Sequence, residues 1–297
     1  MQTIGILYAI ITVLAWGTWL APSQKVQFKN QQIKTFYVAL ANLALAVLVF
    51  MVQGFSGLTW GGFWLPFTGG LVWAVSGLLA FIATDRLGMA RAYGLWAPIN
   101  MCVSIAWGAV LFNEFFAART ITLVLLAVSL TLILAGVLLI IFAKGTGRQS
   151  QAPTAMLGGL ASALGAGVLW GSYYIPIKLS AAPLWAAAFP LSVGIFTGSL
   201  VLVALKRQPL NLPHPSDTWR ALSTGLLWGI GNYGMLLLVE QIGAGRGFTI
   251  SQLGIVVNGL VGVYAFKDPA PKSRAAALTL TGCTLATLGG ILLGTLK

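Results

Sequence analysis

The stretch that decides the fold of this chain runs from Thr224 to Gly262 and reads TGLLWGIGNYGMLLLVEQIGAGRGFTISQLGIVVNGLVG. It contains two apolar segments joined by a short Gly-rich connection, and each approaches the length of about 20 residues that a helix needs to cross a bilayer. Both segments carry polar side chains, although an amide without a partner in hydrocarbon costs several kcal/mol. These side chains must therefore face a cavity, a pathway or another helix; they are Trp228 and Asn232 in the first segment, and Ser251, Gln252 and Asn258 in the second.

The pattern of this stretch occurs a second time, earlier in the chain, at a shift of 155 residues. The corresponding pairs include Gly70 and Gly225, Trp73 and Trp228, Asp85 and Glu240, Tyr93 and Phe248, and Arg91 and Arg246. At a shift of 154, Trp16-Gly17-Thr18-Trp19 and Pro22 correspond to Trp170-Gly171-Ser172-Tyr173 and Pro176. Because the shift holds within one residue over most of each half, the chain is a duplicated unit.

Composition excludes a soluble globular domain. The 297 residues are 58% apolar and only 7% charged, whereas soluble domains carry about 25% charged residues. The net charge of +12 comes from residues at the ends of apolar segments, which favours contact with anionic lipid headgroups over nucleic acid. The first apolar run lacks a basic leader and a cleavage site, so we expect it to be a retained helix. Cys102 and Cys283 are isolated, and we expect no metal, no cofactor and no enzymatic chemistry.

Ten apolar runs of spanning length divide the chain into two sets of five. We place them near 4–22, 35–53, 64–84, 91–112, 119–142, 156–177, 184–205, 219–240, 246–266 and 275–295. The predicted organisation is a first five-helix repeat over residues 1–143, a polar linker over 144–154 and a second five-helix repeat over 155–297.

Basic residues give this arrangement an orientation. The connections after the odd-numbered spans contain 13 of the 17 Lys and Arg residues, and the opposite side with both termini contains 4. The excess of positive charge marks the cytoplasmic side, so we expect both termini outside. Because five is an odd number, the second repeat must cross the membrane in the opposite sense to the first. Inverted-topology repeats are typical of secondary transporters, whose substrate site lies near mid-membrane where the repeats meet.

Aromatic and amide side chains also share helical faces in the first half. Trp96 and Asn100 lie four residues apart in the fourth span, and Trp73 lies in the third. Flat rings pack on the C–H faces of sugars while amides exchange hydrogen bonds with hydroxyl groups. These residues therefore predict a site for a neutral polyhydroxylated ligand. The alternative is that the amides join helices and that the Trp side chains only fill space.

Two spans carry residues that interrupt a helix. Gly17 with Pro22, and Gly171 with Pro176, place a Gly and a Pro five residues apart in the first and sixth spans. Each Pro removes a helical hydrogen bond, and the sequence therefore predicts a kink or a break at each place. We interpret these positions as hinges, with kinks needed only for packing as the alternative.

Acidic residues are scarce, and none stands at mid-membrane. The candidates for proton coupling are Glu240 first and Asp85 second, at the ends of corresponding spans. The alternative is that each carboxylate pairs across a short turn with the Arg six residues later, Arg246 or Arg91. In the last span, small residues recur every fourth position at Gly282, Ala286, Gly290 and Gly294. We expect this ridge to pack on the fifth span of a monomer, with a homodimer contact as the alternative.

The motifs of spans eight and nine resemble a known family. GLLWGIGN, residues 225–232, followed by FTISQL, residues 248–253, resembles the glucose/ribose porter family of the drug/metabolite transporter superfamily, and WGIGN is similar to the L-rhamnose–proton symporter branch. The resemblance implies sugar uptake, coupled to protons, with Trp228, Asn232, Ser251 and Gln252 as site positions. The chain departs from the family's Gly-Glu-Arg/Lys pattern at KDPAPKSR, residues 267–274, and it has Gly77 where the second half has Asn232.

These observations predict an all-α membrane protein of ten transmembrane helices, arranged as two inverted-topology repeats. Its expected function is uptake of a monosaccharide such as glucose, ribose or rhamnose across the cytoplasmic membrane by alternating access, with a proton as the co-substrate and the lipid bilayer as its surroundings. One alternative is an exporter of amino acids, nucleobases or hydrophobic compounds, which the same architecture could serve. Another is a membrane protein that recruits a partner, but the connections are too short to present a soluble binding surface.

Overall fold

The structure is a computed structural model that describes residues 3–53, 58–112, 120–143, 153–207, 209–242 and 244–295. Every regular element in these ranges is helical, so the all-α prediction is confirmed. The elements are α1 (Thr3–Thr18), α2 (Gln31–Gln53), α3 (Trp60–Leu87), α4 (Met89–Phe112), α5 (Thr120–Phe142), α6 (Pro153–Ser172), α7 (Tyr174–Leu179), α8 (Leu184–Lys206), α9 (Pro215–Ile242), α10 (Ala244–Ser251), α11 (Gly254–Leu260), η1 (Val261–Ala265) and α12 (Arg274–Thr295).

Helix lengths fit a protein that crosses a membrane many times. In the described part of the chain, nine helical stretches are long and apolar enough to span a bilayer. Two of these stretches are composed of consecutive helices. These two are Thr154–Leu179, which joins α6 to α7, and Gly247–Ala265, which joins α10, α11 and η1. The one remaining predicted span, the first, near 4–22, corresponds to α1. Its 16 residues give a length of about 24 Å, shorter than the roughly 30 Å of a hydrocarbon core.

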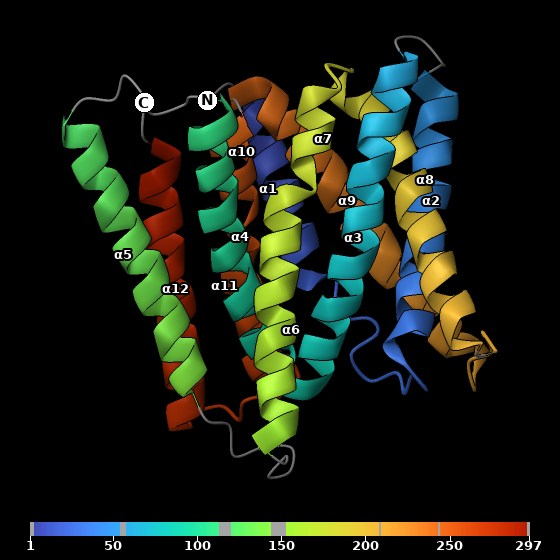
Figure 1. Cartoon of the computed structure of the whole chain (residues 1–297). Coiled ribbons are helices and arrows are strands. Elements are labelled where there is room, and N and C mark those ends of the chain that lie inside the picture. The colour runs from blue at the N-terminus through green and yellow to red at the C-terminus, as the bar shows by residue number, and fades with distance from the viewer. Residues whose placement is uncertain are drawn as a thin grey trace.

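The long helices stand side by side and alternate in direction (Figure 1). α1 begins and α12 ends on the same side of the bundle (Figure 1). Contacts between the two halves dominate the centre: α3 packs against α6 and α8, while α9 packs against α1 and α2. α5 and α12 form a separate pair at one edge (Figure 1). The two halves are therefore interleaved, and the centre of the molecule belongs to both.

Glycine permits the closest of these crossings. A Cβ atom at Gly70 of α3 would collide with the carbonyl oxygen of Leu191 in α8, and one at Gly225 of α9 would collide with the carbonyl oxygen of Val38 in α2. Gly70 and Gly225 occupy corresponding positions of the two halves. Backbone contact of this kind is how transmembrane helices approach when the hydrophobic effect cannot drive them together.

Three spans are broken inside the bundle. α1 ends at Thr18, and Pro22 lies in the turns that follow; α6 ends at Ser172, and Pro176 lies in the short helix α7. The helices therefore end where the sequence predicted interruptions, although the hinge role stays a prediction. The third break, at Gln252 between α10 and α11, was not predicted. There the Gln252 backbone N–H donates to Thr249 O at 3.1 Å, which closes a tighter turn than an α-helix does.

Positive charge is segregated to one side. The connections after α1, α3, α8 and η1 lie on the lower side of the bundle in Figure 1. Among the basic residues whose side chains are described, only Lys178 lies away from these connections and the helix ends that adjoin them. The linker predicted at 144–154 lies mostly outside the described residues. Glu114, Arg119 and the side chain of Arg246 lie wholly outside them.

The small-residue ridge of α12 contacts helices of the same chain. A Cβ atom at Gly282 would lie 2.6 Å from the carbonyl oxygen of Gly136 in α5, and Ala286 is buried against the same helix. Gly290 faces Met101 of α4, and Gly294 faces Ile250 of α10. These contacts favour the intramolecular interpretation of the ridge, because they leave little of its surface for a second copy.

Candidate functional site

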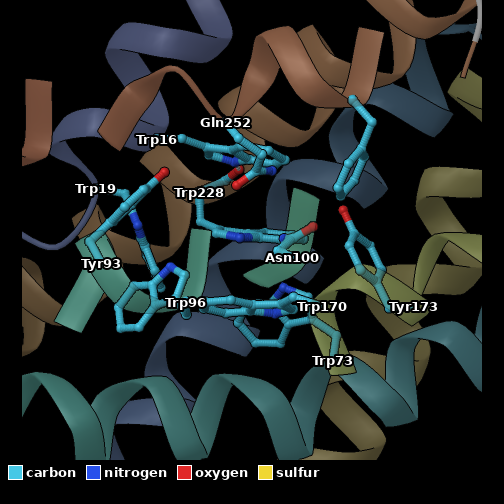
Figure 2. Close-up of a pocket in the computed structure, with 11 residues that line it drawn as sticks. Trp16, Trp19, Trp73, Tyr93, Trp96, Asn100, Trp170, Tyr173, Trp228 and Gln252 are labelled. Carbon is cyan, nitrogen blue, oxygen red and sulfur yellow. Dashed lines mark hydrogen bonds between the residues drawn. The ribbon is translucent and has the colours of Figure 1, made fainter. Parts of the chain in front are cut away.

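A cavity lined mainly by aromatic rings lies in the middle of the bundle, where α1 and α6 end. Six Trp side chains, three other aromatic rings and two amides surround an empty volume of about 310 Å³, part of which is open to solvent. Figure 2 shows these side chains converging from both halves of the chain. They are Trp16, Trp19, Trp73, Tyr93, Trp96, Asn100, Trp170, Tyr173, Trp228, Phe248 and Gln252.

Ring-to-ring contacts hold the walls of this aromatic cavity in place. The Trp73 and Trp228 rings are 4.5 Å apart in an edge-on arrangement, and Trp96 meets Trp170 at 5.3 Å in the same manner. Trp16 lies nearly parallel to Trp228 at 6.4 Å. All three distances fall in the range of about 4.5–7 Å that aromatic pairs prefer, where each pair adds roughly 0.5–1.5 kcal/mol beyond burial. The cavity is thus a preorganised surface rather than a loose gap.

The indole N–H groups of this cavity are not all satisfied. Trp16 Nε1 donates to the backbone oxygen of Trp228 at 3.1 Å, which fixes that ring. By contrast, the Nε1 atoms of Trp73 and Trp170 are buried and have no hydrogen-bond partner among the described residues. A buried donor without an acceptor is destabilising and is uncommon in native proteins. Trp73 and Trp170 thus bring two unused indole donors to the residues that line the cavity.

Two amides add polarity to the aromatic walls. Asn100 of α4 lines the cavity and accepts a 3.3 Å hydrogen bond from the Ser104 hydroxyl through Oδ1. Gln252 lines it from the break between α10 and α11. An amide offers both a donor and an acceptor, so the cavity can bind hydroxyl groups in either role. No acidic or basic side chain of the described residues lines it.

Five of the eight residues predicted to bind substrate line the cavity: Trp73, Trp96, Asn100, Trp228 and Gln252. The other three are buried beside it and have protein partners. Asn232 accepts a hydrogen bond from the Tyr173 hydroxyl at 3.3 Å. The Ser251 hydroxyl donates to Gly247 O of its own helix at 2.7 Å, and Asn258 Nδ2 donates to Gly17 O at 3.2 Å. In this conformation these three side chains support the walls.

Two of the four predicted hinge residues, Gly17 and Gly171, directly follow the lining residues Trp16 and Trp170. Gly17 at the end of α1 packs so closely on Val257 of α11 that a Cβ atom would overlap that side chain. Gly171 at the end of α6 packs in the same way on Val103 of α4, with a Cβ atom 2.6 Å from the Val103 Cβ. The two contacts correspond at a shift of 154 residues. The broken ends of α1 and α6 are thus held against equivalent surfaces of the opposite half.

The two acids predicted to couple protons have different surroundings. Asp85 is exposed near the end of α3, where it lines a second, polar cavity with the buried Lys34. Glu240 is exposed near the end of α9. The structure shows no ion pair within 4.0 Å between Asp85 and Arg91 among the described residues, and the Nε and Nη2 atoms of Arg91 lack hydrogen-bond partners there. The pairing of Glu240 with Arg246 involves a side chain outside the described part.

Sequence reasoning missed six residues of the cavity: Trp16, Trp19, Tyr93, Trp170, Tyr173 and Phe248. The signal that could have found them is the repeat itself. Eight of the eleven lining residues are corresponding pairs, namely Trp16 and Trp170, Trp19 and Tyr173, Trp73 and Trp228, and Tyr93 and Phe248. A position occupied by an aromatic ring in both halves therefore marks the site better than a polar residue found in one half only.

Comparison with known proteins agrees with a site built for a small polar solute. The family described as sugar transport proteins matches residues 7–296, nearly the whole chain. The chain belongs to the sugar transport protein family. The resemblance carried by WGIGN and FTISQL is confirmed, and the sugar transport protein is not an enzyme.

Individual relatives extend over the full length of the chain. A protein of Enterococcus faecalis named "Putative sugar uptake protein" is 27% identical over 296 residues, 99% of each chain. "Probable glucose uptake protein GlcU" of Bacillus cereus is 24% identical over 294 residues, covering 98% of this chain and 99% of its own. A solved crystal structure matches with a TM-score of 0.67 at 19% identity, over 97% of this chain and 98% of that one. At that identity the last match supports the fold alone.

The contact between Tyr173 and Asn232 predicts a measurable effect on stability. Tyr173→Phe leaves the buried Asn232 Oδ1 without its donor, so we expect a lower melting temperature, corresponding to about 1 kcal/mol. The matched control is Tyr233→Phe, which removes a buried hydroxyl that has no partner among the described residues, and it should not lower the melting temperature. Thermal unfolding of the purified protein in detergent measures both, and equal losses in the two variants would contradict the assignment.

Proposed function

We propose that this sugar transport protein takes up a neutral monosaccharide across the cytoplasmic membrane by alternating access, in symport with a proton, with both termini outside. The observation that carries the proposal is the aromatic cavity with its two buried, unpartnered indole donors at Trp73 and Trp170. A sugar hydroxyl is an acceptor for such a donor, whereas a hydrocarbon solute would leave both unsatisfied.

The chemistry of the cavity suits a sugar in two further respects. Ring faces pack against sugar C–H groups and remove them from water, as apolar burial favours. Asn100 and Gln252 can each donate to one hydroxyl oxygen and accept from another hydroxyl group. The exporter alternative is less well supported, because a cationic compound would gain from an acid and the described lining residues include none.

The alternating-access mechanism depends on two repeats of opposite orientation. Helix contacts come in corresponding pairs: α3 on α8 with α9 on α2, α3 on α6 with α9 on α1, and α4 on α6 with α11 on α1. The contacts of Gly17 with Val257 and of Gly171 with Val103 correspond in the same way. Alternation between two such equivalent arrangements supports a cycle that exposes the cavity first on one side and then on the other.

Labelling of introduced cysteines tests the inverted repeats and their orientation. Gln53 and Arg207 are both exposed and correspond at a shift of 154 residues. In intact cells, a membrane-impermeant thiol reagent should label Gln53→Cys, whereas Arg207→Cys should react only after the membrane is opened. Cys102 and Cys283 lie within helices α4 and α12, and the unmodified protein measures their background. Labelling of both variants from the same side would exclude inverted repeats.

Transport by purified protein in proteoliposomes tests the substrate. Labelled glucose, ribose and rhamnose should be compared, and at least one should accumulate. Trp228→Ala removes a cavity wall and should reduce uptake at least about tenfold, because a buried aromatic ring contributes more than 1.4 kcal/mol to binding. Measurements at matched amounts of reconstituted protein separate this loss from poor expression.

The control for this variant is Trp219→Ala, on the same helix. Trp219 is 69% exposed, so its loss should leave uptake within about twofold, consistent with the small effects of exposed substitutions. Normal transport by Trp228→Ala would remove the cavity from the proposal. Uptake of none of the three sugars, together with counterflow of an amino acid or nucleobase, would favour the exporter.

Asp85 is the better candidate for the group that carries the coupled proton. Asp85 lies on α3, the helix that also carries Trp73, and it lines a cavity with the ammonium group of Lys34. A carboxylate next to a cavity can exchange protons with water there, and its charge can bias the positions of the helices around it. Glu240, the first candidate from the sequence, becomes the second, and it occupies the corresponding position of the other half.

Replacement of each acid separates these candidates. Asp85→Asn should abolish sugar accumulation driven by an imposed pH gradient, because the side chain can no longer gain and lose a proton, while sugar counterflow without a gradient continues. Glu240→Gln serves as the matched comparison and should retain gradient-driven accumulation. The reverse result would transfer the role to Glu240, and gradient-driven accumulation in both variants would exclude coupling through either acid.

A further inference from the structure

A second cavity lies beside the connection between α1 and α2 and differs from the first in character. It has an empty volume of about 280 Å³, part of it open to solvent, and its lining is mostly polar. The lining residues are Ser23, Gln24, Val26, Phe28, Gln31, Lys34, Phe81, Thr84 and Asp85. The connection after α1 lies on the lower side of the bundle in Figure 1, the side with most of the described basic residues.

Lys34 is the unusual member of this polar cavity. Only 4% of its surface is exposed, and lysine is rarely buried to that extent without a partner. Its ammonium group lies 4.6 Å from the centre of the Phe81 ring and 5.6 Å from that of Phe28. In the described part of the chain it makes no hydrogen bond and no ion pair within 4.0 Å, although Asp85 is near enough to interact electrostatically. The ammonium therefore has donors that the protein leaves unused.

The shared fold does not require a lysine at this place. Positions 187 and 188 of α8 lie at shifts of 153 and 154 residues from Lys34, and each holds an Ala that is fully buried. The equivalent helix of the second half thus packs with a methyl group where α2 carries a charged side chain. A buried charge is destabilising unless it is compensated. Its presence in only one half is better explained by a ligand than by packing.

The aromatic and polar cavities are linked by a contact between one ring of each. Trp19 lines the aromatic cavity, Phe81 lines the polar one, and the two rings pack at 5.6 Å. The Lys34 ammonium rests on the same Phe81 ring. A solute that leaves the aromatic cavity past Trp19 therefore meets the polar cavity next.

We propose that the polar cavity is a second binding site for a neutral polyhydroxylated solute, the same sugar that the aromatic cavity binds, on its way to the lower side of the membrane. This inference rests on the proposed function. Lys34 donates to one hydroxyl oxygen and Asp85 accepts from another hydroxyl group, while Gln31 and Thr84 add neutral partners. An anion such as phosphate fits less well, because the Asp85 carboxylate would repel it.

Equilibrium binding to the purified full-length protein in detergent tests this second site. The probe is labelled glucose, or ribose or rhamnose if that is the sugar the wild-type protein transports. Wild type should approach two sugars per chain at saturation, and Trp228→Ala should keep the site at Lys34. Adding Lys34→Gln to Trp228→Ala should weaken the remaining binding at least about tenfold, as expected when a charged hydrogen bond is lost.

Controls distinguish a site from a general loss of structure. Lys29→Gln makes the same substitution at an exposed lysine of the same connection and should leave the second site intact; Gln31→Ala should weaken it without removing a buried charge. Should Trp228→Ala prove unstable, Gln252→Ala replaces it. One sugar per chain in wild type, or residual binding unchanged by Lys34→Gln, would overturn the proposal.

Two further outcomes separate this inference from its premise. Retention of labelled inorganic phosphate in a Lys34-dependent manner, with no sugar bound there, would identify an anion site and overturn the polyol assignment. Failure of the proposed function has a different signature: no sugar would be transported by wild type, and Trp228→Ala would have no effect on binding. A single-site protein that still transports sugar would refute only the second site.

Discussion

A bilayer supplies no water to the polar groups of the helices that cross it, and this constraint organises the whole molecule. Backbone groups are mostly satisfied within the helices, and some buried amides find partners. Asn42 donates to the Ser192 hydroxyl between α2 and α8, and Asn258 Nδ2 donates to the carbonyl oxygen at the broken end of α1, although Asn258 Oδ1 has no partner among the described residues. Against this background the few unsatisfied groups stand out. Among them are the indole Nε1 atoms of Trp73 and Trp170 in the aromatic cavity. In the polar cavity, the Lys34 side chain is buried.

Broken helices are what bring these groups together. An unbroken α1 would continue through the space that Trp19 and the following turns occupy, and an unbroken α10–α11 segment would carry Gln252 elsewhere on its surface. Close glycine contacts at Gly17 and Gly171 then hold the ends of α1 and α6 against the opposite half. Chain interruptions and small residues, rather than any long polar helix, therefore create room for a solute in the centre of an apolar bundle.

The sequence was sufficient for the helical nature of the chain and for nine of its ten predicted spans, because length and apolarity fix both; α1 is shorter than predicted. It was less informative about individual polar residues. Ser251 satisfies its hydroxyl on its own helix and Asn232 meets Tyr173, and no pattern of spacing distinguishes those partners from a ligand. Trp16 and Tyr93 stood out in the sequence only as members of repeat pairs, and Trp and Tyr are common at membrane interfaces in any case. Their role became apparent only when both halves met at one cavity.

The two halves of the aromatic cavity are related but unequal: Gly77 stands where the other half has Asn232, and Trp96 stands where it has Ser251. In a carrier that alternates between two arrangements, such inequality gives the outward- and inward-facing forms different free energies and different affinities for the solute. Detailed balance forbids this difference from concentrating anything by itself, since each gain in affinity on one face is offset by the free-energy difference between the two forms. Net accumulation must then be driven by a second gradient. The unequal halves determine only the affinity and the rate of transport at each face of the membrane.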